Sequence, residues 1–255
     1  MSHSSSQQDE GDLSFQDLPP FPSDVPTVPL LRISLNKLVA RDEEELQRLW
    51  KACCEIGFFY LDLRSAPSSG NKRDSAHEDS ESSAQEGRID GEGLLGDAAE
   101  LFELGKRIFQ LPVEEKMKYD FKDRGSYYGY KGLGAGVVDS KGTRDRNEFY
   151  NASKDDLLGV SDALPAPEVL SKEDSRKLLR GFVLRSHAIV AMLLDLLNER
   201  LGLPEGKLGS LHRLREASGD QIRWVSAPPQ PLDDRKKALG EHTGTFLSLF
   251  LSKVL

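Results

Sequence analysis

One histidine near the end of the chain is the clearest starting point for chemistry. His242 lies in the stretch GEHTGTFLSLFLSKVL (240–255), in a sequence with five histidines. An imidazole is a common ligand of iron and zinc, but a metal centre needs further ligands close by. The adjacent Cys53 and Cys54 lack zinc-type spacing with His187 or His212. The sequence also has neither Gly-x-Ser-x-Gly nor His-Glu-x-x-His, so a hydrolytic or unrelated metal site gains little support.

A glycine- and tyrosine-rich stretch over 125–151 is a second place where chemistry could occur. Three alternate glycines there suggest a loop that cradles a phosphate: Gly132, Gly134 and Gly136. They neither follow a clear strand nor open a helix, so the dinucleotide-binding fingerprint fails and we predict a mobile loop. Four other residues have side chains that could contact a substrate: Tyr127, Tyr128, Tyr130 and Arg146. Such residues are common in loops without function, and we do not place them in the site.

The bulk properties bound the kind of protein that must position these residues. With 34 basic and 42 acidic residues among 255, the net charge is −8, which disfavours nucleic-acid binding. The two adjacent cysteines fit a reducing compartment. No signal peptide is recognisable, and we find no stretch of the roughly 18 apolar residues that a membrane span needs. We therefore expect a cytoplasmic protein without nucleic-acid or membrane partners.

Periodicity predicts an α+β chain. Apolar residues spaced near 3.6 predict helices within 41–57, 94–112 and 172–201. Strands are predicted at 28–35, 57–63, 211–217, 220–229 and 242–251, with the third and fourth forming an antiparallel pair. Two polar stretches have too few large apolar residues to fold: a disordered arm at 1–27 and a disordered insertion at 65–93.

A sheet is thus expected to begin only at about residue 208, after a mostly helical first part. Three strands with open edges make neither a finished sandwich nor a finished barrel, so the predicted architecture is incomplete. The apolar segment TFLSLFL, within the last strand, would suit pairing with another sheet edge. Self-association through that strand is therefore one expectation.

Five stretches occur in an order that resembles a known family. They are LWKACCEIGFFYLDL, IFQLPVEEKMKY, GYKGLG, RNEFYNASKDDLLG and DQIRWVSAPPQP…LGEHT. Together they resemble the isopenicillin N synthase-like Fe(II)- and 2-oxoglutarate-dependent oxygenases, from about residue 26 to Thr243, with 65–93 as an insertion. The resemblance implies a helical N-terminal region, 28–203, followed by the first strands of a double-stranded β-helix, or jelly roll, at 204–255.

The resemblance also implies a chemistry. Such enzymes hold Fe(II) with two histidines and one carboxylate, and use 2-oxoglutarate and O2 as cosubstrates to oxidise a small organic substrate. His242 matches the first metal ligand within GEHT, but Gly244 stands where the family has aspartate. The 13 residues that follow His242 contain no histidine or arginine, so the second histidine and the Arg-x-Ser pair that grips 2-oxoglutarate are absent.

A further departure lies on the strand that contains QIRWVSAPPQP. Many relatives carry there an Asn-x-Tyr that helps to hold 2-oxoglutarate, and the resemblance places Arg223 and Val225 at those positions. Cosubstrate contacts there are thus unsupported. Arg223 is open to two interpretations, an anion-binding residue or a solvated surface position.

Two hypotheses for the whole chain follow. In the first, the gene belongs to a working oxygenase, and a splicing or gene-model break after Thr243 leaves a chain that does not turn over 2-oxoglutarate. In the second, the chain is a non-catalytic binding or regulatory relative, which acts through its helical lobe and its exposed edge strand. The abrupt failure of the motif at one point favours the first, because drift would scatter losses along the chain.

Overall fold

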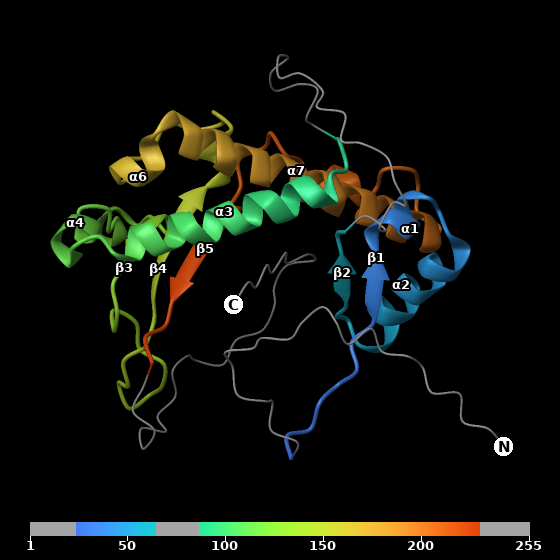
Figure 1. Ribbon diagram of the computed structural model, residues 1–255, viewed down its shortest axis with the longest axis horizontal. Helices are drawn as coiled ribbons and strands as arrows, with labels where there is room; N and C mark the ends of the chain where they lie inside the picture. The colour runs from blue at the N-terminus through green and yellow to red at the C-terminus, as the bar shows by residue number, and fades with distance from the viewer. Residues whose placement is uncertain (1–23, 65–86, 230–255) are drawn as a thin grey trace, which may run out of the picture.

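The computed structural model describes residues 24–64 and 87–229. Two long helices, α3 (Gly91–Phe109) and α7 (Glu173–Arg200), lie side by side and form the frame of the molecule (Figure 1). A two-stranded sheet lies at one end of this pair and a three-stranded sheet at the other. The predicted α+β class is confirmed, whereas a jelly roll is not visible in the described residues.

The first end of the frame follows the sequence prediction closely. Strand β1 (Arg32–Ser34) pairs in parallel with β2 (Tyr60–Asp62), and the connection contains α1 (Leu35–Val39) and α2 (Glu43–Glu55). The Asp42 side chain accepts a hydrogen bond from the Glu45 amide, which caps α2, and acidic residues fill its first turn. The predicted helix is thus confirmed, because cap, charge and apolar period agree.

The central helices keep the predicted order with small changes of boundary. Helix α7 begins at Glu173 and ends at Arg200, close to the predicted 172–201. Helix α3 begins at Gly91, inside the stretch assigned to a disordered insertion, because the Asp90 side chain accepts a hydrogen bond from the Gly93 amide and caps it. Residues 65–86 of that stretch, and the arm up to residue 23, lie outside the described residues.

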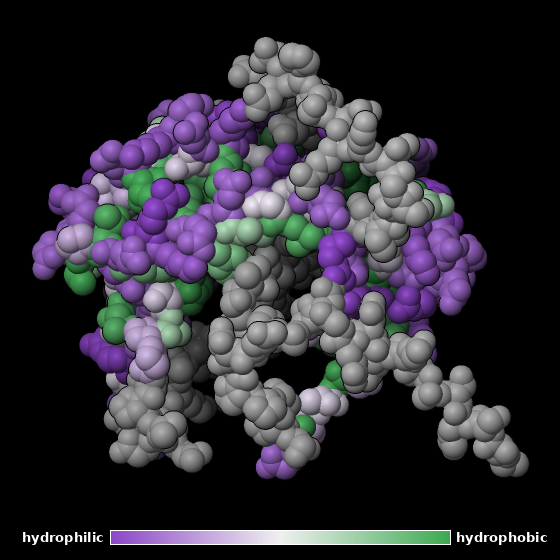
Figure 2. Space-filling view, in the orientation of Figure 1, coloured by the Kyte–Doolittle hydropathy of each residue, from purple (hydrophilic) through white to green (hydrophobic). Residues whose placement is uncertain are grey.

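Helix α7 departs from one expectation about composition. By length and hydropathy alone it could cross a membrane, since an 18-residue window has a mean hydropathy of 1.4. However, α7 packs along α3, and Arg185 within it forms ion pairs of 2.5 Å with Asp97 and 3.2 Å with Asp90. These contacts are those of a core helix, and Figure 2 shows hydrophilic residues over much of the helical layer.

The three-stranded sheet corrects the sequence prediction most strongly. It contains β3 (Gly129–Lys131), β4 (Glu148–Ser153) and β5 (Gln221–Ser226), all antiparallel, with β4 in the centre. Strand β3 and the first four residues of β4 lie inside the predicted mobile loop 125–151, so the sheet begins well before residue 208. The predicted strand 211–217 is wrong: the segment forms turns, in which the Glu216 amide bonds to the Arg213 carbonyl.

Short helices connect these larger elements. They are α4 (Val113–Met117), α5 (Lys154–Leu157), α6 (Glu168–Ser171) and two 3-10 turns at Lys122–Arg124 and Gly209–Leu211. The largest apolar cluster lies where α3, α6 and α7 meet one face of the three-stranded sheet. Its buried members include Leu101, Leu104, Ile108, Tyr130, Tyr150, Leu179, Ile222 and Trp224. Within residues 24–64 and 87–229, the helices thus cover one face of the sheet, and the other face is called the uncovered face below.

Candidate functional site

The uncovered face of the three-stranded sheet is the candidate site. On β5, Ile222 and Trp224 are buried toward the helices, whereas Arg223 and Val225 are exposed. The alternation follows from the period of two along a strand. The register of β4 against β5 places Asn151 opposite Arg223, and Phe149 opposite Val225. Side chains from two strands therefore meet on this face.

A buried indole fixes β5 to the helical layer. The Trp224 Nε1 donates a 2.8 Å hydrogen bond to the Leu101 carbonyl of α3, and its ring lies 6.4 Å from that of Tyr150. The glycine at position 105 lets the ring approach, because a Cβ there would lie 2.5 Å from the Trp224 Cδ1. The orientation of β5, and so of Arg223, is set by this contact.

On the uncovered face, neutral groups hold the Arg223 guanidinium. Its Nε donates a 2.8 Å hydrogen bond to Asn151 Oδ1, and its Nη2 bonds to the Tyr127 hydroxyl. The guanidinium lies over two rings, 4.4 Å from the centroid of Phe149 and 5.0 Å from that of Tyr127. The buried Asn151 is held in turn, since its Nδ2 donates to the Tyr127 carbonyl at 2.7 Å. Cation–π contacts and a fixed hydrogen bond leave Arg223 positioned with its full charge.

Two other cations near the sheet, Lys131 and Lys116, are neutralised by carboxylates. Lys131 forms an ion pair with Asp145 and donates a 2.7 Å hydrogen bond to the Asn147 carbonyl. Lys116, buried, forms a 2.7 Å ion pair with Glu148.

Glu148 also accepts a hydrogen bond from the Tyr130 hydroxyl. Burial, and then this hydrogen bond, raise the pKa of the Tyr130 phenol. Lys116, Glu148 and Tyr130 support the sheet from its helix-covered side. Lys131 lies opposite Phe149 and so on the same face as Arg223, where Asp145 neutralises it. Among the cations on the three described strands, Arg223 is thus the one that no carboxylate pairs with.

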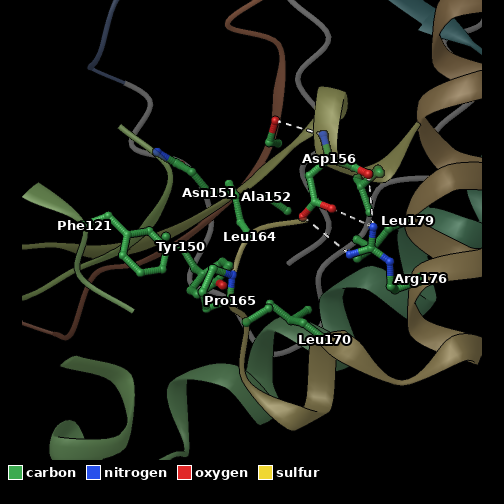
Figure 3. Close-up of a pocket in the computed structure, with 14 residues that line it drawn as sticks. Phe121, Tyr150, Asn151, Ala152, Asp156, Leu164, Pro165, Leu170, Arg176 and Leu179 are labelled. Carbon is green, nitrogen blue, oxygen red and sulfur yellow. Dashed lines mark hydrogen bonds and ion pairs between the residues drawn. The ribbon is translucent and has the colours of Figure 1, made fainter. Parts of the chain in front are cut away.

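The cavity drawn in Figure 3 is too small for a substrate. It lies between β4, α6 and α7, where Tyr150, Leu170 and Leu179 point into it. An ion pair of 2.8 Å between Arg176 and Asp156 closes one side. Its volume of about 20 Å³ has room for one water molecule. This cavity is a packing space in the core.

The sequence-predicted residues have different fates. His242 and Gly244 lie outside the described residues. Within 24–64 and 87–229, no group of three histidine, cysteine, aspartate or glutamate side chains could hold a metal ion. Among the four loop residues, Tyr127 joins the site, whereas Tyr130 is buried and the Tyr128 hydroxyl bonds to the Ser218 carbonyl at 2.9 Å.

Sequence reasoning missed Asn151 and Phe149 as site residues. The signal was available in NEFYNAS, where these two residues alternate with the buried Tyr150. It was masked because the surrounding stretch is rich in glycine and charge, which favours a loop interpretation.

Comparison with known proteins defines the class. Residues 95–168 match the family described as the non-haem dioxygenase in morphine synthesis N-terminal region. A 2-oxoglutarate-dependent dioxygenase of Aspergillus fumigatus is 33% identical over 221 residues, which cover 84% of this chain and 51% of that protein. The 2-oxoglutarate-dependent dioxygenase gloE of Glarea lozoyensis is 28% identical over 87% of this chain and 58% of its own length. A full-length Neurospora crassa protein, solved in complex with alpha-KG, aligns with a TM-score of 0.47 and 18% identity, over 71% of this chain and 50% of that chain.

Over more than four fifths of its length the chain is similar to 2-oxoglutarate-dependent dioxygenases, and these matches support its membership of that family. It spans between one half and three fifths of the length of these two curated relatives. The resemblance inferred from the five ordered stretches is confirmed by these matches.

Proposed function

We propose that this chain forms the N-terminal part of an oxygenase that oxidises a small organic substrate with Fe(II), 2-oxoglutarate and O2. In this proposal residues 28–203 form the N-terminal region, which supplies the helices and the strands β3 and β4, and 204–255 continue the jelly roll from β5. One observation carries it: the chain matches 2-oxoglutarate-dependent dioxygenases over more than four fifths of its length.

The arrangement of the three-stranded sheet supports the proposal. A jelly roll encloses its ligand site between two sheets, and helices cover the outside of one of them. Helices α3 and α7 cover one face of the sheet, and polar and aromatic side chains line the other. The uncovered face would then line the interior, with Arg223 and Val225 directed toward the site.

The donor set within these residues does not fit an iron centre. His242 would supply one imidazole, but Gly244 has no side chain where a carboxylate is needed. A facial triad needs two imidazoles and a carboxylate on one side of the metal, and one imidazole alone binds Fe(II) poorly against water. We therefore derive no catalytic step through iron, and we propose that the 255-residue polypeptide alone does not turn over 2-oxoglutarate.

Succinate release tests the proposal in two arms. The purified 255-residue chain, given Fe(II), ascorbate and 2-oxoglutarate, should release no succinate above the protein-free background. Fe(II)-dependent succinate from this chain would overturn the proposed inactivity.

The second arm sequences transcripts beyond the Thr243 codon. An in-frame continuation that restores His-x-Asp, a second histidine and Arg-x-Ser should encode a protein that releases succinate. A stop codon in every transcript, with no such continuation, would instead favour a non-catalytic binding relative.

A further inference from the structure

We propose that Arg223 is a preorganised carboxylate-binding residue, which takes the carboxylate of a small organic acid on the uncovered face of the sheet. The assignment deepens the proposed function, because it rests on that face as the one that lines the ligand site. It resolves the two interpretations of Arg223 in favour of anion binding.

The geometry of the side chain is the first argument. Asn151, which is 1% exposed, accepts the Nε hydrogen bond at 2.8 Å, and the rings of Phe149 and Tyr127 confine the guanidinium plane. An unconstrained surface arginine loses rotamer freedom when it binds a ligand, and that loss weakens binding. Because Arg223 has already lost this freedom in the folded chain, the cost is not incurred again on binding.

The charge balance is the second argument. Three half-buried cations of the described ranges, Lys131, Arg176 and Arg185, each form an ion pair with a carboxylate, whereas the more exposed Arg223 forms none. The partners of Arg223 are an amide oxygen, a phenol and two rings, none of which neutralises a positive charge. A guanidinium presents its N–H groups in a planar fork that matches the two oxygens of a carboxylate.

The neighbours of Arg223 indicate what the acid would carry. Val225 is 56% exposed on the same face, and the register places it directly opposite Phe149. Val225 lies two residues along the strand from Arg223, and its side chain points to the same face. An acid with an apolar body could therefore bury that body beside Val225 and Phe149. Two sources of the carboxylate are compatible with this chemistry, the organic substrate and 2-oxoglutarate itself.

Ligand titration of the full chain in a carboxylate-free buffer, without iron, tests the assignment. The probes are benzoate, its neutral analogue benzamide, and 2-oxoglutarate, and binding is followed by NMR shifts. We expect saturable carboxylate binding that is about tenfold weaker for benzamide, in line with about 1.4 kcal/mol for one charge-assisted contact at an exposed site. Tighter binding of benzoate than of 2-oxoglutarate assigns the site to the substrate, and the reverse assigns it to the cosubstrate.

Two pairs of variants locate the binding. Arg223→Gln should weaken the carboxylate about tenfold, whereas Arg107→Gln, which removes the same charge from an exposed position on α3, should leave it unchanged. Val225→Glu places a competing carboxylate two residues along the same face and should abolish binding. Val225→Gln, which has the same size as that glutamate, should retain it. The Val225 pair keeps the test valid if Arg223→Gln fails to fold.

Equal affinity for benzoate and benzamide, equal binding by the wild type and Arg223→Gln, or no saturable binding at all would each overturn the assignment. Failure of oxygenase activity would not, because the titration needs neither iron nor turnover. Conversely, loss of the carboxylate site would leave the succinate test of the proposed function intact.

Discussion

The contact between Gly105 of α3 and Trp224 of β5 makes a quantitative prediction about how the sheet is attached to the helices. A Cβ added at residue 105 would lie 2.5 Å from Trp224 Cδ1 and 3.2 Å from Nε1. Carbon atoms in contact lie at about 3.5–4.0 Å, so the added methyl group would overlap the indole by about 1 Å. The ring has little freedom to retreat, because it is 7% exposed and its Nε1 bonds to the Leu101 carbonyl.

The magnitude follows from two opposing effects. Alanine favours a helix interior over glycine by about 1 kcal/mol. Overpacking a filled core costs about 1–3 kcal/mol, and the fixed indole places this site in the upper half of that range. Gly105→Ala should therefore lower the free energy of unfolding by about 1–2 kcal/mol.

Gly96→Ala on the same helix is the matched control. No atom lies within 4 Å of a Cβ built at Gly96, so only the propensity gain remains and this variant should be about 1 kcal/mol more stable. Urea unfolding followed by circular dichroism measures both variants. Thermal unfolding should separate their midpoints in opposite directions, by about 2–4 °C per kcal/mol.

A double-mutant cycle with Trp224→Leu assigns the cost to the contact. The smaller side chain removes the overlapping atoms, so Gly105→Ala should cost at least about 1 kcal/mol less in that background. Two results would refute the reasoning: stabilisation of the Gly105→Ala protein equal to that of Gly96→Ala, or the same cost of Gly105→Ala in both backgrounds.

Two further predictions concern ionisable side chains. Burial, and secondarily the neighbouring Cys54, raise the pKa of the Cys53 thiol, whereas Cys54 is exposed. At about pH 8, iodoacetamide should therefore alkylate the Cys53→Ser protein, which keeps Cys54, faster than the Cys54→Ser protein, which keeps Cys53. Equal alkylation rates in intact mass spectra would contradict this. Burial also raises the pKa of the Tyr150 phenol, so the folded chain keeps a proton that the unfolded chain loses above about pH 10. The stability that depends on this proton is fully present below about pH 10 and is lost as pH rises through the raised pKa, by up to about 1.4 kcal/mol per pH unit. Relative to a baseline at about pH 8, Tyr150→Phe should flatten the loss of urea stability above about pH 10, and an unchanged slope there would exclude Tyr150 as its source.

The helices could be predicted from the sequence because their signals are local. In α2, the cap, the acidic first turn and the apolar period all lie within 42–55, and in α7 the apolar pattern extends over 28 residues. The start of a helix is harder to predict where its first turn lacks the apolar pattern, as in the turn of α3 that follows the Asp90 cap. The signals that identify these helices lie within the helices themselves, so neither a partner strand nor a distant contact is needed to recognise them.

The sheet could not be predicted in the same way because its strands are short and depend on partners. Strand β3 has three residues, and Gly129 within it is required twice over: its φ is +84°, and Phe121 and the Tyr119 carbonyl leave no room for a side chain. The alternating segment 211–217 is predicted as a strand but is not one. Lys154 Nζ binds the carbonyls of Leu214 and Glu216, which holds that segment in turns. Alternation of apolar and polar residues along the chain does not by itself distinguish a strand from a segment that is held in turns.

The candidate site shows the same limit more sharply. The two interpretations of Arg223 could not be separated by its strand, because the residues that hold it are Asn151 and Tyr127, 72 and 96 positions earlier in the chain. By contrast, the family could be recognised from ordered local stretches. The order of those stretches therefore identified the class of protein, and only the tertiary pairing of β4 with β5 revealed the state of the guanidinium.

The two faces of β5 are mechanically linked, and this connects the stability of the sheet with the proposed carboxylate site. Trp224 and Arg223 are adjacent, so a shift of the indole away from α3 must be accommodated by the backbone that also carries the guanidinium. Arg223 is held on the other side by the buried Asn151, which does not move without losing its bond to the Tyr127 carbonyl. We therefore expect a displacement at Gly105 to strain or break the Arg223–Asn151 bond. In both cases the preorganisation that favours carboxylate binding decreases together with stability, whereas a solvated surface arginine would show no such coupling.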